Sequence, residues 1–447
     1  AHLVQDPASA GLPLVVTNTN DSGAGSLRQA ILNANAMING PTPDVITFNI
    51  PGAGVHTIQP TSALPVIGEG VLIDGYSQPG ASGNTLATGT NAVLQIELSG
   101  ANLSATTNIL LAVLGSDTTI RGLIMNQAAG STGSGTTLAL MSLASNARIE
   151  GNFIGTNAVG TAAAANPGSG IRLDNVSNST IGGATPAARN LISGNGYGVF
   201  LRGPETTGNL IAGNTIGTNA AGTAAIPNTV FGIRLGPYVA NNLIGGTTAG
   251  ARNLISGNGA GIDAASNWPG SLYTLGDGNR IEGNYIGTSA DGSGALGNGA
   301  VGQNTTGGII ISDLNLGAGT LTIGGTTAGA GNLIAGNKGS GIVVRSDDFS
   351  RPSGMVVVQG NRIGTNAAGT AANPNQGDGI YQESFTLPLM VGGTSAAARN
   401  LISGNLGSGI AGGSYYGMAL FQGNYIGTDI TGTLPLGNGK HGILATA

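Results

Sequence analysis

The chain has 447 residues, of which 82 are glycine and only 8% are charged, and its formal net charge is -5. Because 40% of the residues are hydrophobic, this composition excludes a charged disordered chain, and the aromatic share of 4% favours narrow stacked strands over a wide globular core. The lack of cysteine excludes disulfides and zinc–thiolate sites, no apolar run is long enough for a membrane span, and the scattered arginines form no basic stripe for nucleic acid.

The first predicted element is a short amphipathic helix over residues 26–35. Leu27, Ala30, Ile31 and Ala34 fall at helical spacing, and Ser26 stands where an N-cap belongs. A solenoid exposes an apolar cross-section at its first coil, so we expect this helix to cover that end. The predicted cap consists of Ser26, Leu27, Arg28, Ala30 and Ile31.

The rest of the chain is predicted to consist of strands. Residues 1–44 would form an N-terminal strand and the capping helix, and residues 45–144 the irregular first coils, with strands near 45–50, 56–58 and 72–75. Residues 145–447 would form regular repeats of one continuous solenoid.

Two motifs alternate strictly through the regular region. The sequence G-N-x-I-G-T begins at positions 151, 213, 283, 360 and 423, and I/V-G-G-x-[TS]-x-x-A-x-N-L-I-x-G-N covers 181–195, 244–258, 323–337 and 391–405. The shortest interval between copies is 62 residues, and strand-like pieces lie near 190–192, 198–201 and 209–211. We therefore expect about three coils of roughly 20 residues per repeat, which predicts an all-β fold, a right-handed single-stranded parallel β-helix.

Asparagines in both motifs stand next to glycine, where sharp corners are expected. Because coils stack in register, amides at equivalent corners can bond to one another along the axis. Gly-Asn pairs also suit the hairpins of a propeller or a sandwich, but the single tryptophan, Trp268, disfavours propeller blades. The predicted corner residues are Asn152, Asn214, Asn284, Asn361, Asn424, Asn195, Asn258, Asn337 and Asn405.

Polar or small-residue loops follow each copy of the first motif and are expected to protrude from one edge. They cover residues 157–163, 219–225, 289–296, 366–372 and 429–436. Their bland composition argues against a tight site. Arg189, Arg252 and Arg399 precede Asn-Leu-Ile in three copies, and Gly331 replaces them in the other, so we expect these arginines to anchor a loop or a neighbouring chain.

The best catalytic candidate is Asp347-Asp348, with His441-Gly442 further on, a pattern loosely similar to polygalacturonase-like hydrolases. Adjacent strand residues point to opposite faces, and the supporting motifs of such enzymes are missing. The other acids are spread over separate coils, which favours single solvated carboxylates: Asp74, Asp174, Asp263, Asp313 and Asp378. We therefore expect no catalytic residue, no metal site and no cofactor.

The N-terminal region resembles a known family. Residues 21–31, D-S-G-A-G-S-L-R-Q-A-I, followed by Ile46-Thr47-Phe48 and Ile73-Asp74-Gly75, resemble the N-terminal region of bacterial surface and secreted β-helix proteins of the CSLREA type, and the later coils resemble pectate-lyase-like repeats. Gly25 stands where the namesake cysteine would be and Gln29 where its glutamate would be. The resemblance implies a right-handed β-helix, secretion and surface display, but no reaction.

These observations favour a non-catalytic structural β-solenoid at the cell surface or outside the cell, as a filament or layer building block with an adhesive role. The sequence ends without a polar capping segment, so self-association through the solenoid ends is expected. A polysaccharide or cell-surface ligand is a further expected partner. The alternative is a polysaccharide lyase, hydrolase or carbohydrate-binding β-helix. A third hypothesis is an ice- or mineral-binding face formed by stacked threonines, Thr156, Thr218, Thr288, Thr365 and Thr428.

Overall fold

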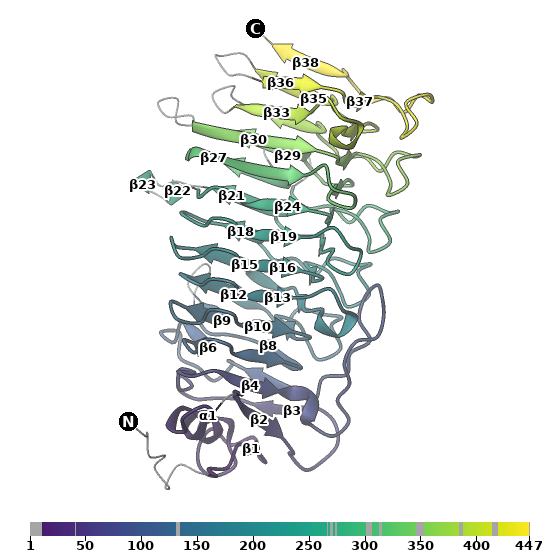
Figure 1. The fold of residues 1–447 in the computed structure, drawn as a ribbon. Coiled ribbons are helices and arrows are strands. Elements are labelled where there is room, and N and C mark those ends of the chain that lie inside the picture. The colour runs from purple at the N-terminus through teal and green to yellow at the C-terminus, as the bar shows by residue number, and fades with distance from the viewer. Residues whose placement is uncertain are drawn as a thin grey trace.

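The computed structural model describes residues 11–40, 42–130, 135–265, 267–268, 271–272, 275–300, 306–312, 315–345, 353–383, 388–413 and 419–446. In this part the chain winds around one axis, and its strands form three long parallel sheets (Figure 1). Parallel strands of one sheet joined by crossovers take a right-handed course. The predicted fold class, a right-handed parallel β-helix, is confirmed.

The three sheets run along the axis, and each takes one strand from successive coils. Sheet A contains β1 (Val15–Val16), β2 (Asp44–Phe48), β4 (Val71–Asp74), β7 (Thr119–Arg121), β10 (Arg148–Glu150), β13 (Thr180–Gly182), β16 (Leu210–Ala212), β19 (Leu243–Gly245), β24 (Arg280–Glu282), β27 (Asn315–Gly324), β30 (Ser353–Gln359), β33 (Leu389–Gly392) and β36 (Ala419–Gln422). Sheet B contains β3 (His56–Ile58), β5 (Ile96–Ser99), β8 (Leu123–Asn126), β11 (Phe153–Ile154), β14 (Leu191–Ile192), β17 (Thr215–Ile216), β20 (Leu254–Ile255), β25 (Tyr285–Ile286), β28 (Leu333–Ile334), β31 (Arg362–Ile363), β34 (Leu401–Ile402) and β37 (Tyr425–Ile426). Sheet C contains β6 (Ile109–Val113), β9 (Thr136–Met141), β12 (Asn166–Asp174), β15 (Asn195–Arg202), β18 (Phe231–Leu235), β21 (Ile262–Ala265), β26 (Gly307–Ser312), β29 (Ser340–Arg345), β32 (Ile380–Gln382), β35 (Ile410–Gly413) and β38 (Ile443–Thr446).

The predicted coil length is wrong. In sheet A, Arg148 pairs with Thr180 and Thr180 pairs with Leu210, so one coil takes 30 to 32 residues and the 62-residue repeat spans two coils. The pieces near 190–192, 198–201 and 209–211 are β14, β15 and β16, which belong to sheets B, C and A. They are the three sides of one coil and not three separate coils.

The two alternating motifs occupy the same place in successive coils. Phe153 of the first motif pairs with Leu191 of the second, and Leu191 pairs with Thr215 of the next first motif. The inward residues of these strands are isoleucines, such as Ile154, Ile192 and Ile216, which are fully buried. Strands only two residues long suffice here because each coil adds one row of branched side chains to a continuous core.

The corner that follows the strand of the first motif depends on the second glycine of that motif. Gly155 has φ of +87°, a left-handed conformation that other residues adopt at a cost. A Cβ atom at this position would lie 2.2 Å from the carbonyl oxygen of Ser193 in the next coil. The next coil therefore lies too close to this corner to leave room for a side chain.

The capping helix α1 (Leu27–Ala36) lies at the N-terminal end of the β-helix (Figure 1). The Ser26 hydroxyl accepts a hydrogen bond from the Gln29 amide at 3.2 Å, as expected for an N-cap. Leu27, Ala30 and Ile31 are buried in the core, so the apolar face of the helix covers the first coils. The guanidinium of Arg28 pairs with Asp21 at 2.7 Å and also donates to the carbonyl oxygens of Ser62 and Ala63.

The remaining elements are short. Three 3-10 turns are described, η1 (Gly75–Ser77), η2 (Pro186–Ala188) and η3 (Ala396–Ala398). An antiparallel pair, β22 (Asn267–Trp268) and β23 (Ser271–Leu272), projects from the side of the solenoid (Figure 1). Of the helices described, none combines the length and the hydropathy that a membrane span requires.

Candidate functional site

The corner asparagines lie in ladders of side-chain hydrogen bonds that run along the axis. In the first ladder each Nδ2 donates to the Oδ1 of the next asparagine at 2.9 to 3.2 Å. Its members are Asn152, Asn190, Asn214, Asn253, Asn284, Asn332, Asn361, Asn400 and Asn424. Besides the two long ladders, a short ladder joins Asn209, Asn242 and Asn279.

The second long ladder lies at another corner, with corresponding distances of 2.8 to 3.0 Å. Its members are Asn166, Asn195, Asn228, Asn258, Asn298, Asn337, Asn375, Asn405 and Asn438. The nine asparagines singled out in the sequence are thus divided between the two long ladders. The sequence did not predict the asparagines that lie between these nine in the ladders. In the first ladder they are the asparagines of Asn-Leu-Ile, and in the second ladder they follow the loops. With the correct coil length, both sets could have been recognised.

The threonines that end the first motif do not form a binding face. Thr156, Thr218, Thr288 and Thr365 are fully buried. Each hydroxyl donates to the carbonyl oxygen of the following residue at 3.0 to 3.1 Å. The hypothesis of an exposed threonine array for ice or minerals is therefore wrong, because these side chains point into the corner.

The loops after the first motif form a ridge along the outside of sheet B, on the right of Figure 1. Each loop closes through an antiparallel bridge, such as Thr156 with Ala163. Neighbouring loops bond to one another, as the Ala220 amide does to the Gly160 carbonyl at 2.8 Å and the Ala290 amide to the Gly222 carbonyl at 3.1 Å. The ridge is therefore one continuous structure, since each loop after the first bonds to the loop two coils before it.

Arg189 anchors a segment from a distant part of the chain. We call residues 84–91 the strap. The guanidinium of Arg189 donates to the carbonyl oxygens of Leu86, Gly89 and Ala87 and, through Nε, to that of Gly213. Burial lowers the pKa of Arg189 from its ordinary value, yet four carbonyl acceptors satisfy the cation.

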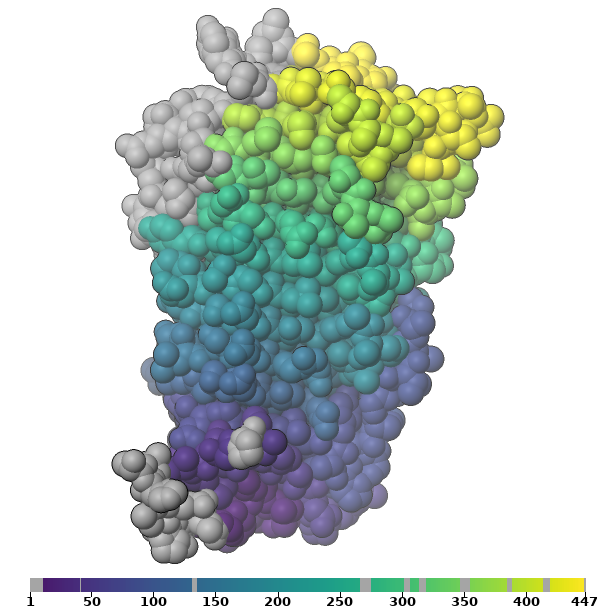
Figure 2. Space-filling view, in the orientation of Figure 1, coloured from purple at the N-terminus to yellow at the C-terminus, as the bar shows by residue number. Residues whose placement is uncertain are grey.

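The strap bridges coils that are not neighbours. It precedes β5 in the chain but contacts the coil of β14, three strands further along sheet B. Asn84 donates to the Pro186 carbonyl at 3.0 Å, and the Thr90 amide donates to the Ala220 carbonyl of the ridge at 2.8 Å. In Figure 2 the blue-purple atoms of the N-terminal coils extend along the right edge beside the teal coils, where this contact lies.

The equivalent arginines in two other copies stack on tyrosine rings instead. The guanidinium carbon of Arg252 lies 4.0 Å from the centre of the Tyr285 ring, and that of Arg399 lies 4.1 Å from the centre of the Tyr425 ring. Each arginine also donates from Nε to a glycine carbonyl, Arg252 at 3.3 Å and Arg399 at 3.0 Å. The same local packing therefore occurs twice.

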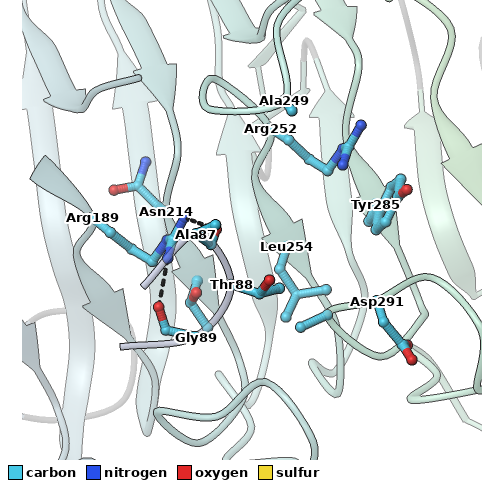
Figure 3. Close-up of a pocket in the computed structure, with 12 residues that line it drawn as sticks. Ala87, Thr88, Gly89, Arg189, Asn214, Ala249, Arg252, Leu254, Tyr285 and Asp291 are labelled. Atoms are coloured by element: carbon cyan, nitrogen blue, oxygen red, sulfur yellow. Dashed lines mark hydrogen bonds between the residues drawn. The ribbon is translucent and has the colours of Figure 1, made fainter. Parts of the chain in front are cut away.

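A pocket of about 270 Å³ lies between the strap and the Arg252–Tyr285 pair (Figure 3). Arg189 and the strap form one side, Arg252 and Tyr285 form the opposite side, and Leu254 lies between them. The pocket is open to solvent and mixes hydroxyl, amide, guanidinium and apolar groups. Its lining residues are Ala87, Thr88, Gly89, Arg189, Asn214, Thr215, Ala249, Arg252, Leu254, Tyr285, Ala290 and Asp291.

Asp291, on the ridge, supplies the single carboxylate among these lining residues. It accepts hydrogen bonds from the hydroxyls of Ser289 at 2.6 Å and Ser293 at 2.7 Å. These bonds lower the pKa of Asp291 to about 2. The carboxylate is therefore ionised at any pH near neutrality and cannot serve there as a proton donor.

The outer face of sheet C carries a second group of aromatic and charged residues. Tyr197 stacks on Phe200 with ring centres 5.5 Å apart, and Arg234 lies over the rings of Phe200 and Phe231 at 5.7 and 5.5 Å. Arg234 also lies 3.4 Å from the carboxylate of Asp263. These side chains contact one another across neighbouring strands. We therefore interpret the group as structural packing on the outer face of sheet C.

The sequence-based catalytic candidates do not converge in the described residues. Asp347, Asp348 and Asp313 lie outside the described residues. His441 is exposed. Asp74 pairs with Arg121 at 2.9 Å, and Asp174 pairs with Arg202 at 2.6 Å.

Asp378 is buried, and its carboxylate accepts a hydrogen bond from the Ser408 amide. No cluster of three or more metal-ligating acids or histidines occurs among the residues that the structure describes.

Fold and site define a right-handed parallel β-helix with a polar pocket on its side. No protein-family model matches the chain, and no curated protein matches it. Among solved structures, the Dettilon tailspike protein is similar, with a TM-score of 0.49 and 15% identity over 96% of this chain and 66% of that chain. ORF18 of Geobacillus virus E2 has a TM-score of 0.29 and 12% identity over 92% of this chain and 60% of that chain.

The chain therefore spans less than two thirds of the length of either structure. At these identities and scores, neither similarity assigns a ligand or a reaction to this chain. The resemblance of residues 21–31 to the CSLREA type stays a prediction.

Proposed function

We propose that the protein is a rigid, non-catalytic β-helix of the cell surface or exterior that binds polysaccharide through the pocket in Figure 3. The pocket is the observation that carries the proposal. Sugars present hydroxyl groups on one side and CH groups on the other, and the pocket offers Thr88 and Arg252 as polar partners beside the apolar Leu254. A pocket of about 270 Å³ that opens on the long side of a rod suits a few units of a long chain.

The acid–base properties of the pocket support binding without cleavage. Glycoside hydrolysis generally uses two carboxyl groups that flank the bond, one of them protonated as the general acid. Asp291 is the single carboxylate of the lining, and its pKa of about 2 keeps it ionised. Of the alternatives, this arrangement favours carbohydrate binding over glycoside hydrolysis.

The proposal is tested with the whole chain and a panel of polysaccharides, acidic and neutral, by affinity electrophoresis and by assays for new reducing or unsaturated ends. We expect retention by at least one polysaccharide and no new ends. Ala249→Trp should abolish retention, because Ala249 is exposed at the edge of the pocket and a bulky ring there would fill it.

Ala396→Trp is the matched control. Ala396 holds the equivalent position in the last copy of the second motif, is also exposed, and lies outside the pocket. Equal loss of retention in both variants would exclude this pocket as the binding site. Accumulation of cleavage products in proportion to protein concentration would replace the proposal with the enzymatic alternative.

A further inference from the structure

Arg252 is the pocket residue whose bonding capacity is least used. Its Nε donates to the Gly283 carbonyl at 3.3 Å, and its guanidinium carbon lies over the Tyr285 ring, 4.0 Å from the ring centre. Among the described residues, no hydrogen bond or carboxylate engages either of its terminal nitrogens. A guanidinium carries five N–H donors, so most of its capacity remains for a ligand.

The arginines at the equivalent positions show why this is particular to one copy. Arg189 is saturated by the carbonyl groups of the strap. Arg399 stacks on Tyr425 in the same way as Arg252 stacks on Tyr285, but it does not line the pocket. Gly331 removes the side chain from the remaining copy. Arg252 alone among the four combines unused donors with a position in the pocket lining.

The charge of the lining favours an anion. It contains two arginines and one aspartate, so its formal charge is positive although the whole chain carries -5. The aspartate, Asp291, is already held by the hydroxyls of Ser289 and Ser293. The contact with the Tyr285 ring restrains the Arg252 guanidinium, which reduces the ordering cost of a two-point contact with a planar anion.

We propose that the pocket recognises acidic polysaccharides, with the carboxylate of a uronic acid bound by the terminal nitrogens of Arg252. This inference rests on the proposed function and specifies its ligand class. Thr88 lies in the same lining, is exposed, and offers its hydroxyl group to the sugar ring. A carboxylate matches the guanidinium in geometry, whereas a hydroxyl can use only one donor at a time.

The test compares an oligogalacturonate with its methyl ester, which keeps the sugar and removes the charge, by isothermal titration calorimetry on the whole chain. We expect the acid to bind and the ester to bind at least about tenfold more weakly, as for loss of a charge-assisted contact. Arg252→Gln should weaken binding of the acid by about the same factor. Added salt should weaken binding to the wild type more than to this variant.

Arg399→Gln is the control for folding and for unspecific charge effects, because it removes the same charge and the same stacking contact outside the pocket. It should bind the acid as the wild type does. Equal binding of acid and ester, an unchanged Arg252→Gln variant, or equal losses in both variants would overturn the inference. If neutral polysaccharides still bind in that case, the proposed function stands, and if nothing binds, both proposals fail.

Discussion

Each asparagine of the long ladders serves several coils at once. The Asn284 Oδ1 accepts hydrogen bonds from the Asn253 side chain at 2.9 Å and the Asn253 amide at 3.3 Å. Its Nδ2 donates to the Ile244 carbonyl at 2.9 Å and to Asn332 at 3.0 Å. The side chain is fully buried, so a single amide satisfies backbone and side-chain groups that water cannot reach.

Replacing this residue should therefore be costly. In Asn284→Ala the buried amides of Asn253 lose their acceptor, and we expect a loss of about 2 to 4 kcal/mol in the free energy of unfolding, measured in urea. Asn366→Ala is the control, because its side chain accepts bonds from Thr370 and Ala371 in an exposed loop, and it should cost about 1 kcal/mol or less. Similar losses in both variants would contradict a special role for the ladder.

At the scale of elements, the strap is the feature that departs from the repeat. The strand pairs join neighbouring coils and the loops of the ridge bond two coils away, but residues 84–91 bond to Arg189, about 100 positions away in the sequence. The contact ties a coil near the N-terminal end to a coil three strands further along sheet B and builds one wall of the pocket. Its stability depends on one side chain, because Arg189 supplies three of the bonds to the strap.

Arg189→Gln should release the strap without unfolding the solenoid. A glutamine cannot reach three carbonyl groups, so we expect the amides of the strap, such as that of Thr90, to exchange hydrogen at least about tenfold faster. Amides in the interior strands should keep their protection. Arg399→Gln, at the equivalent position without a strap, should leave exchange in residues 84–91 unchanged, and faster exchange there would contradict the anchoring role.

The elements also show how far sequence reasoning reaches. Repeated motifs and the helical spacing of Leu27, Ala30 and Ile31 were enough to predict the β-helix and its first helix. The coil length was misjudged because a strand of two residues, such as Leu191–Ile192, looks the same whether it forms a side of a coil or a whole coil. The pocket could not be predicted, since the strap is composed of small residues and its contact with Arg189 joins distant parts of the chain.

At the scale of the molecule, the described part is a rod. Sheet A contains 13 strands there, and at about 4.8 Å per strand the rod is about 60 Å long. The colours of Figure 2 follow one another along the axis, so most contacts join adjacent coils. Stability in such a molecule is nearly a sum over neighbouring coils, and stiffness follows from three sheets that share one core.

Self-association through the ends stays a hypothesis at this scale. If coils of different molecules stack, the length measured by small-angle X-ray scattering should grow in steps of one rod with protein concentration, while the cross-section stays constant. Sedimentation velocity over the same range should show the matching species. A single species of one rod length at every concentration would remove the filament and layer hypothesis and leave the pocket as the basis of function.

The side-chain amide dipoles of the two long asparagine ladders share one orientation along the axis. Every rung of the two long ladders donates from Nδ2 toward the higher-numbered coil, so the amide dipoles point the same way instead of cancelling. Aligned amides polarise one another, and reversing one rung would set two donors or two acceptors face to face. The orientation of each amide is therefore set by its neighbours, and both long ladders run in the same direction along the axis.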